Sequence, residues 1–256
     1  MQLNAPIKSV SALFRKAVLD PLLPRRCPLS GDEIDDARAV APPGWGALHF
    51  VEAPCCPRCG APFAAFYGEG VECPSCIADP PRFDAARVAL SYNEAARRLV
   101  SGLKFGDRTD YAPMLGAWMA RAGADLIEPR SILAPIPLHW RRLAARRFNQ
   151  SALLAALIAS ATKARLDVNL LKRVRSTPPQ TGISDAAARR RNVAGAFAAP
   201  AAARAKLQGA HVILIDDVLT TGATLSAAAR TLKAAGAARV DALALSRVVK
   251  GGIGAI

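Results

Sequence analysis

The feature that most constrains this chain is the stretch 212–224, which reads V-I-L-I-D-D-V-L-T-T-G-A-T. Its first four residues form an unbroken aliphatic run, which is typical of a strand buried on both faces of a parallel sheet. We expect this strand to stop at Asp216 and Asp217. A hydroxyl-rich loop follows, and residues 225–230 are strong helix formers. The order is therefore strand, acidic pair, loop and helix.

This order predicts a binding site for a phosphorylated sugar. The first N–H groups of a helix lack intrahelical acceptors and lie at the positive end of the helix dipole, so they favour a phosphate. The threonines add hydroxyl donors, the glycine permits close approach of the backbone, and the two carboxylates can accept hydrogen bonds from neighbouring ribose hydroxyls. A solvated acidic turn before an ordinary helix is the alternative. The predicted ribose and phosphate ligands are Asp216, Asp217, Thr220, Thr221, Gly222, Ala223 and Thr224.

The string at 212–224 resembles the phosphoribosyl diphosphate (PRPP) signature of type I phosphoribosyltransferases. This resemblance implies an α/β fold with a parallel sheet flanked by helices, and PRPP bound with Mg²⁺ at the carboxyl end of the strand. In purine-salvage members of that class, the position matching Thr220 is an aspartate beside the base. The hydroxyl found here therefore disfavours a purine acceptor.

The charge balance favours a polyanionic partner. The chain has 256 residues, 52% of them apolar, which is enough for a packed core in one or two domains. It carries 34 basic and 20 acidic residues, a formal charge of +14. Nucleic acid and a substrate with several phosphates both fit this charge, and a basic surface without a binding role is the third option. Aromatic residues make up only 5%, which weakens any platform for stacking bases.

The sequence predicts no membrane insertion. Residues 6–20 have apolar side chains at helical spacing, but charged residues interrupt them, so the expected N-terminal helix (1–26) is neither a signal peptide nor a spanning helix. No other window approaches about 18 uninterrupted apolar residues. We expect a cytoplasmic protein.

All six cysteines lie between residues 27 and 76. Two C-x-x-C pairs, separated by thirteen residues, have the spacing of knuckles that bring four thiolates around tetrahedral zinc. Disulfides are disfavoured in the cytosol, and a redox C-x-x-C is normally single and at a helix start; redox-active or free thiols remain the alternative. We therefore predict a zinc ribbon over 27–81, with structural Zn²⁺ held by Cys56, Cys59, Cys73 and Cys76.

The other two cysteines lie outside this set. Cys27-Pro-Leu-Ser30 looks like a third knuckle whose second sulfur is replaced by a hydroxyl, which is a poor zinc ligand, so we expect no second metal there. Cys55 is either a spectator or a register alternative for ligation. For Cys27 and Cys55 we favour the role of small buried apolar residues.

Hydrophobic periodicity predicts further elements in a domain spanning 82–250. Strands are expected over 87–92 and 131–137, and helices over 94–104, 111–126 and 151–163. Residues 104–107 should form an exposed basic turn. His139 is expected to have a structural role.

Two loops complete the predicted site. By resemblance to phosphoribosyltransferases, the loop after the second strand contacts pyrophosphate through its backbone. Residues 171–192 begin as a polar, basic and proline-containing stretch, which predicts a mobile loop that closes over the diphosphate, followed by a short helix capped by Ser184. An ordinary surface connection is the alternative. The assigned residues are Ala134, Pro135, Ile136, Pro137 and Leu138 for the pyrophosphate loop, Arg141, Arg142, Arg146 and Arg147 as counter-charges, and Arg173, Arg175 and Gln180 for the basic loop. For at least half of the four counter-charge arginines, a solvated surface position is the alternative.

Four strings together narrow the resemblance to one family. They are R-R-F-N-Q at 146–150, T-P-P-Q-T-G-I-S at 177–184, R-R-R-N-V-A-G-A-F at 189–197, and the stretch 212–224. Together they resemble the ComF family of ComFC-like proteins, over residues 27–247. The resemblance implies a zinc ribbon joined to a phosphoribosyltransferase-type domain, and an association with DNA uptake in natural competence.

Two functions are compatible with these observations. The first is phosphoribosyl transfer from PRPP to an unidentified acceptor. The second is a non-catalytic PRPP- or nucleotide-binding module that handles single-stranded DNA together with other DNA-uptake proteins.

Overall fold

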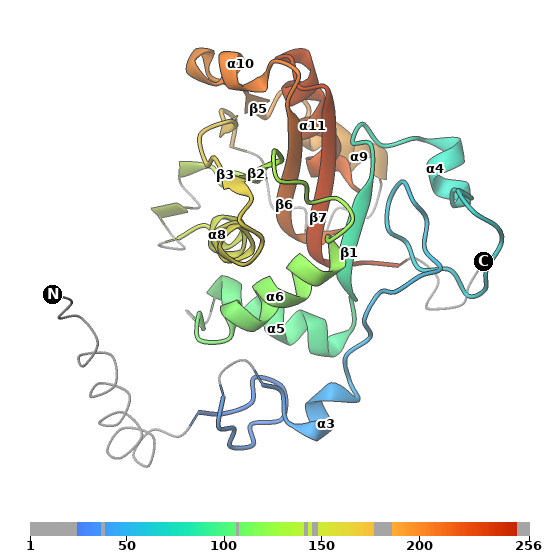
Figure 1. Ribbon diagram of the computed structural model, residues 1–256, viewed down its shortest axis with the longest axis vertical. Coiled ribbons are helices and arrows are strands. Elements are labelled where there is room, and N and C mark those ends of the chain that lie inside the picture. The colour runs from blue at the N-terminus through green and yellow to red at the C-terminus, as the bar shows by residue number, and fades with distance from the viewer. Residues whose placement is uncertain are drawn as a thin grey trace, which may run out of the picture. The chain divides into compact units, whose positions relative to one another are not determined.

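The computed structural model describes residues 25–36, 39–105, 108–140, 143–144, 148–176 and 186–249 (Figure 1). The chain divides into two compact units, residues 1–47 and 48–256. The division falls within the segment predicted to be the ribbon, and the predicted boundary after residue 81 stays a prediction. Expectations for the helix before residue 25, for Arg141, Arg142, Arg146 and Arg147, and for Gln180 and Ser184 lie outside the described residues.

The larger unit is built on a five-stranded parallel sheet with strand order β1-β7-β6-β2-β3 (Figure 1). This arrangement confirms the predicted α/β class. The strands near 87–92 and 131–137 are also confirmed, whereas β7 has no counterpart among the expected strands. The strands are β1 (Ala86–Ser91), β2 (Ile132–Pro135), β3 (Arg165–Leu166), β6 (His211–Leu219) and β7 (Arg239–Arg247).

Helices pack on both faces of this sheet. The core of one face joins Val212 and Leu214 of β6 to Leu232 of α11. Because side chains alternate along a strand, Ile213 faces the opposite side of the sheet, where α8 contacts β6 and β2. The expected helices near 94–104, 111–126 and 151–163 are confirmed. The helices of this unit are α4 (Pro74–Ala78), α5 (Glu94–Phe105), α6 (Ala112–Ala122), α8 (Gln150–Thr162), α9 (Ala186–Val193), α10 (Ala201–Leu207) and α11 (Ala223–Ala234).

Strand β6 does not stop at the acidic pair, so that expectation was wrong. It continues to Leu219, because β7 runs equally far and still pairs with it, Asp216 opposite Ala244 and Leu219 opposite Arg247. On its other side, β2 pairs with β6 only as far as Pro135 opposite Ile215. The two carboxylates therefore lie within β6, where only one strand neighbour remains.

Residues 48–79, which include the four predicted zinc ligands, are hydrogen-bonded to the sheet. The N–H of Val51 donates to Ala89 O at 3.0 Å, and the N–H of Ser91 donates to His49 O at 2.8 Å. Arg247 of β7 donates from Nη1 to Cys59 O at 2.9 Å. These contacts place residues 48–79 in the same compact unit as the sheet.

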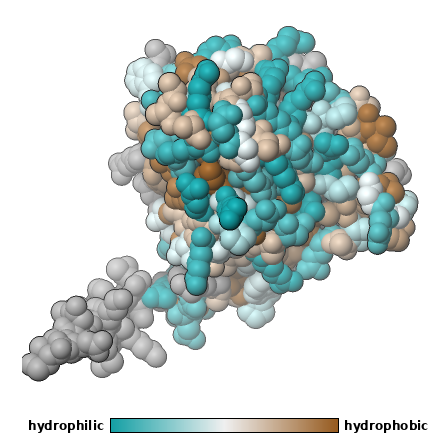
Figure 2. All heavy atoms as spheres, turned by 45° about the horizontal axis from the view of Figure 1, so that its top comes forward, coloured by the Kyte–Doolittle hydropathy of each residue, from teal (hydrophilic) through white to brown (hydrophobic). Residues whose placement is uncertain are grey.

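The surface of one side of the molecule mixes hydrophilic and weakly hydrophobic residues, and strongly hydrophobic residues form only small separate groups there (Figure 2). Among the described residues, no helix has both the length and the apolar character needed to span a membrane.

The end of α5 is held by a tyrosine from the start of α6. Tyr111 Oη donates to Leu99 O at 2.9 Å, and a Cβ built on Gly102 would overlap that hydroxyl. Helix α5 thereby extends through Lys104, whose side chain is only 20% exposed. The expectation of an exposed basic turn at this residue was wrong, because the helix continues and buries the lysine stem.

Gly102→Ala should destabilise the protein by about 1–3 kcal/mol, because the added methyl group must displace the Tyr111 ring or shift α5. Thermal melting would measure this loss. Tyr111→Phe in the same chain removes the overlapping hydroxyl, so the double variant should lose less than the sum of the two single variants. Additive losses would contradict this packing explanation.

Candidate functional site

Three segments meet near the carboxyl end of β6. The N–H of Ile136, just after β2, donates to Ile215 O at 2.9 Å. Asn149 Nδ2, at the start of α8, donates to Ile136 O at 3.0 Å. Ser151 Oγ of α8 donates to Asp216 Oδ1 at 3.2 Å. The loop after β2, the beginning of α8 and the acidic end of β6 therefore form one connected site.

Asn149 connects the start of α8 to the loop after β2, because both the oxygen and the nitrogen of its side-chain amide form hydrogen bonds. Its Oδ1 accepts from the N–H of Ser151 at 3.0 Å and caps the helix. Its Nδ2 makes the bond to Ile136 described above. Residues 149 and 150 belong to one of the strings that resemble the ComF family, but their local pattern did not predict that the next residue, Ser151, would bond to Asp216.

The acidic pair has a cationic partner from a distant part of the chain. Lys104 Nζ of α5 lies 2.9 Å from Asp217 Oδ1, and both side chains are largely buried. No local sequence pattern connects residue 104 with residue 217, so this ion pair was missed. It supplies one positive charge beside two neighbouring carboxylates.

Asp216 is harder to ionise than an ordinary aspartate. Desolvation and the neighbouring Asp217 carboxylate raise the pKa of Asp216 to about 7, although Lys104 and the Ser151 hydroxyl act in the opposite direction. A change of ligand or of neighbouring charge at this position will therefore change its protonation near neutral pH.

The loop between β6 and α11 has the predicted helix start. Gly222 adopts a left-handed conformation, φ 75°, that favours glycine, and α11 begins at Ala223. Its carbonyl accepts from the N–H of Ser226 at 2.8 Å, the first bond of the helix. Thr221 Oγ1 is buried and has no hydrogen-bond partner among the described residues. This unsatisfied hydroxyl lies two residues before the first residue of α11.

The predicted pyrophosphate loop is shorter than expected. Ala134 and Pro135 belong to β2 and are buried, because their strand pairs with β6 as far as Ile215. Ile136, which is also buried, and the half-buried Pro137 and Leu138 form the connecting segment. His139, next in the chain, is 7% exposed.

Two arginines of the predicted mobile loop lie in the described part of the chain, and the side chains of both contact other residues of the protein. Arg173 lies on β4 (Lys172–Arg173), which pairs antiparallel with β5 (Phe197–Ala198), and its guanidinium lies 5.4 Å from the centre of the Phe197 ring. Arg175 Nη2 donates to Asn192 O at 2.8 Å and Ala194 O at 2.6 Å. The expectation of a mobile loop was wrong for residues 172–173, because they form a strand pair.

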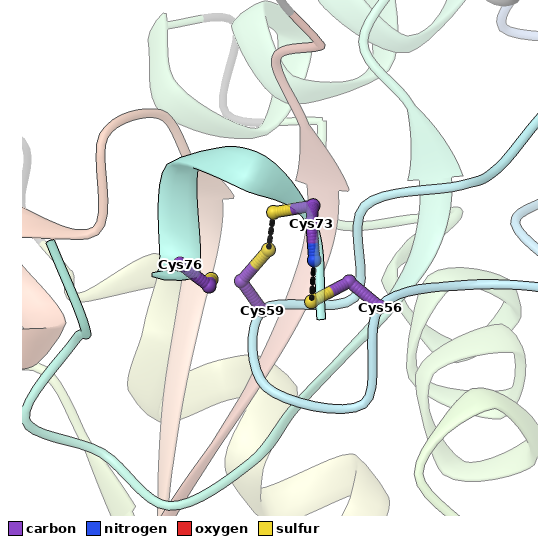
Figure 3. A group of neighbouring side chains, drawn as sticks. All are labelled: Cys56, Cys59, Cys73 and Cys76. Atoms are coloured by element: carbon purple, nitrogen blue, oxygen red, sulfur yellow. Dashed lines mark hydrogen bonds between the residues drawn. The ribbon is translucent and has the colours of Figure 1, made fainter. Parts of the chain in front are cut away.

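The four predicted metal ligands lie together (Figure 3). Their Sγ atoms are all within 4.8 Å of one another, and Cys59 Sγ lies 3.6 Å from Cys73 Sγ. A tetrahedral zinc ion with Zn–S bonds of about 2.3 Å places its sulfurs about 3.8 Å apart, so this donor set fits zinc. The N–H of Cys73 donates to Cys56 Sγ at 3.3 Å, which stabilises a thiolate at that position. The hydrogen bond from the Cys59 thiol lowers the pKa of Cys56 to about 4.

Comparison with known proteins supports the assignment of both the cysteine-rich segment and the domain that contains the acidic pair. Residues 18–77 match a family model described as a double zinc ribbon domain, and residues 149–250 match a phosphoribosyl transferase domain. The fold and the site therefore define a protein that combines a cysteine-rich zinc ribbon with a phosphoribosyltransferase-type domain.

Curated relatives narrow this class to one family. DNA utilization protein YhgH of Salmonella typhimurium is 34% identical over 200 residues, which cover 76% of this chain and 84% of that protein. Competence protein F of Haemophilus influenzae is 30% identical over 204 residues, covering 76% and 85%. Competence protein ComFC of Bacillus subtilis is 28% identical over 201 residues, covering 75% and 77%. This chain belongs to the ComF family.

Asp216→Asn should make stability less dependent on pH. The raised pKa of Asp216 means that its protonated form stabilises the fold fully below the unfolded-state pKa of about 4, and that this contribution is lost as the pH rises through about 7. Between pH 5 and pH 8 the wild type should therefore lose more thermal stability than the asparagine variant. Asp125→Asn, at an exposed carboxylate paired with Arg87, is the control and should follow the wild type. Parallel pH profiles for all three proteins would contradict this assignment.

Proposed function

We propose that this protein binds PRPP with Mg²⁺ at the end of β6 and transfers its phosphoribosyl group to an acceptor, in a role connected with DNA uptake. The observation that carries the proposal is the meeting of the paired carboxylates, the start of α11 and the 136–138 segment at one end of the sheet. Ligands of open parallel α/β sheets bind outside the carboxyl ends of the strands. The names of the relatives support the connection with DNA. The proposal places the protein in the cytoplasm, where thiols stay reduced.

The acidic pair suits a ribose. Asp216 and Asp217 are acceptors when ionised, and two neighbouring ribose hydroxyls are donors. In the protein alone, Ser151 donates to Asp216 and Lys104 pairs with Asp217. A sugar diol that adds donors to this pair would stabilise the ionised form of Asp216, so ribose binding should lower its pKa.

The start of α11 suits the 5-phosphate. Its first N–H groups have no intrahelical acceptors, and the helix dipole favours an anion there. A buried hydroxyl without a partner costs on the order of 1–3 kcal/mol, and a phosphate oxygen would provide the acceptor that Thr221 Oγ1 lacks. The 136–138 segment would then contact the pyrophosphate group through its backbone.

Transfer would break the bond between ribose C1 and pyrophosphate and form a bond between C1 and the acceptor. Magnesium, held mainly through the substrate phosphates, would neutralise charge on the leaving diphosphate. The contribution of this chain is to bind and orient: the carboxylates would hold the ribose, the helix start would hold the phosphate, and Lys104 would supply a positive charge beside the carboxylates.

Mg²⁺-dependent PRPP binding should be measurable by calorimetry, with a dissociation constant of roughly 1 μM to 1 mM as is usual for enzyme substrates. Asp217→Asn should weaken binding about tenfold or more, because it removes an ionised acceptor and leaves Lys104 without its partner. Asp125→Asn, far along the chain from these residues, should bind like the wild type. Unchanged affinity in Asp216→Asn and Asp217→Asn would refute the ribose assignment.

Pyrophosphate release distinguishes an enzyme from a binding module. The enzyme should release pyrophosphate from PRPP faster when its acceptor is added, whereas a non-catalytic module should bind PRPP without acceptor-dependent release. Bases, amines and oligonucleotides should be tested in turn. Failure of every acceptor, with PRPP binding intact, would favour the module.

Single-stranded DNA binding is the second candidate function, and a basic groove supports it. The groove has a volume of about 530 Å³, and its lining includes Arg82, Arg230 and Phe83. Arg58 and Lys233, also in the lining, already pair with Glu72 and Asp84. Within the described part of the chain, Arg82 and Arg230 have no carboxylate partner, so they are the cations best placed to meet phosphates.

The double variant Arg82→Glu/Arg230→Glu should bind oligo(dT) at least tenfold more weakly, and its affinity should depend less steeply on salt, because two phosphate contacts are lost. Fluorescence anisotropy at several salt concentrations would measure both quantities. The matched control is Arg165→Glu/Arg204→Glu, which changes the net charge equally at exposed positions elsewhere. Equal weakening in both variants would indicate a general charge effect and contradict a specific groove.

A further inference from the structure

The first compact unit contains the hydrogen bonds of a zinc knuckle. The N–H of Gly31 donates to Cys27 O at 3.0 Å, and the N–H of Cys27 donates to Asp32 O at 2.7 Å. The same two bonds occur 29 residues later around Cys56, at 2.8 Å each. The glycine of each turn is left-handed, with φ of 82° and 67°. Residues 26–33 therefore have the backbone arrangement of residues 55–62.

The second half of the unit repeats the other knuckle. A short helix, α3 (Pro42–Trp45), follows Ala41 as α4 follows Cys73, and both preceding residues are extended. The N–H of Ala41 donates to Cys27 Sγ at 3.4 Å. In the metal-binding ribbon, the corresponding N–H of Cys73 donates to Cys56 Sγ at 3.3 Å. A sulfur in the first unit thus accepts the same backbone bond as a predicted zinc ligand.

This correspondence identifies four positions that match the ligands of the metal-binding ribbon. Only one of them carries a thiol; the serine hydroxyl is a poor ligand, and the other two side chains have no donor atom, whereas structural zinc takes four ligands. We propose that residues 25–36 and 39–47 form a zinc-free copy of the ribbon, in which apolar packing replaces the metal, so that the chain binds one zinc ion despite its double-ribbon sequence. The positions are Cys27, Ser30, Ala41 and Gly44, which match Cys56, Cys59, Cys73 and Cys76.

Hydrophobic side chains crowd the position that matches the fourth zinc ligand. A Cβ built on Gly44 would lie 3.4 Å from Cys27 Sγ, so a ligand at this position would approach the remaining sulfur. That Cβ would also lie 2.6 Å from Val40 Cγ1 and 3.2 Å from Leu29 Cβ. Cys27, Val40 and Ala41 are 3%, 5% and 7% exposed. The valine and leucine therefore occupy the space that a fourth ligand would need.

The same two positions carry an ion pair in the metal-binding ribbon. Arg58 matches Leu29 and Glu72 matches Val40. Arg58 Nε lies 3.0 Å from Glu72 Oε1. The first unit therefore has two apolar residues where the metal-binding ribbon has an ion pair, and one cysteine where that ribbon has four. Zinc binding is coupled to folding in small ribbons, so the two copies should respond differently to zinc removal.

Metal analysis of the purified wild-type chain tests the stoichiometry directly. Elemental analysis and native mass spectrometry should give about one zinc per chain, Cys73→Ser should lose it, and Cys27→Ser should keep it. Two zinc ions in the wild type, or loss of zinc in Cys27→Ser, would overturn the proposal.

A graft tests the correspondence of positions. The variant Leu29→Arg/Ser30→Cys/Val40→Glu/Ala41→Cys/Gly44→Cys carries the full set of the second ribbon and should bind about two zinc ions. The matched control keeps Ser30 and has Leu29→Arg/Val40→Glu/Ala41→Ser/Gly44→Ser, and it should bind one. A folded graft that binds only one zinc would refute the correspondence.

Hydrogen exchange on the full wild-type chain gives a readout that does not require the graft to fold. After zinc is removed by a chelator, the amides of Gly60 and Cys76 should lose protection, while those of Gly31 and Gly44, which make the equivalent bonds, should keep theirs. Equal loss in both ribbons would show that the first copy also depends on zinc and would overturn the proposal.

Discussion

The candidate site depends on the unequal length of the two strands that flank β6. Val212, Ile213, Leu214 and Ile215 are completely buried and pair on both sides, with β2 and with β7. After Ile215, β2 ends and only β7 continues. The backbone of β6 therefore stays fixed while one edge opens toward the 136–138 segment and the start of α8. Strand β6, which is paired with β7 throughout this stretch, thus carries two carboxylates beyond the end of β2, beside the start of α8.

Electrostatics at this opening follows from the same geometry. Two adjacent carboxylates that are partly removed from water repel each other, so one of them binds a proton readily near neutral pH. The sheet alone cannot compensate for this repulsion. The N–H of Asp217 donates to Asp216 Oδ1 at 2.9 Å, and further compensation comes from Lys104 on α5 and Ser151 on α8, two elements brought to the strand end by packing. A diol would add hydrogen-bond donors to the two carboxylates, and a phosphate would add an acceptor for the N–H groups at the start of α11.

The cysteine-rich region shows that one local fold can be stabilised in two ways. In residues 55–78, four thiols converge, and a metal can hold the turns together. In residues 26–33 and 40–45, the same backbone bonds surround one cysteine, and buried Val40 and Ala41 provide the packing. Backbone geometry is thus retained although the chemistry at its centre differs. Sequence alone points to the first case through C-x-x-C spacing, and it shows the second only through Cys27 and Ser30.

Sequence by itself determined the features that depend on neighbouring residues: the buried run at 212–215, the helix start after Gly222, and the four zinc ligands. These are local because strand burial, helix capping and knuckle spacing each act over a few residues. Only the tertiary structure revealed β7, because its alanines and its buried Asp241 are not typical of a strand inside a sheet. The Asp241 carboxylate is hydrogen-bonded to His211 Nε2 at 2.8 Å and to the N–H of Ala85 at 3.0 Å. The ion pair between Lys104 and Asp217 was also revealed only by the tertiary structure. The attraction between two charges depends on their distance in space, so it produces no periodic pattern in the sequence.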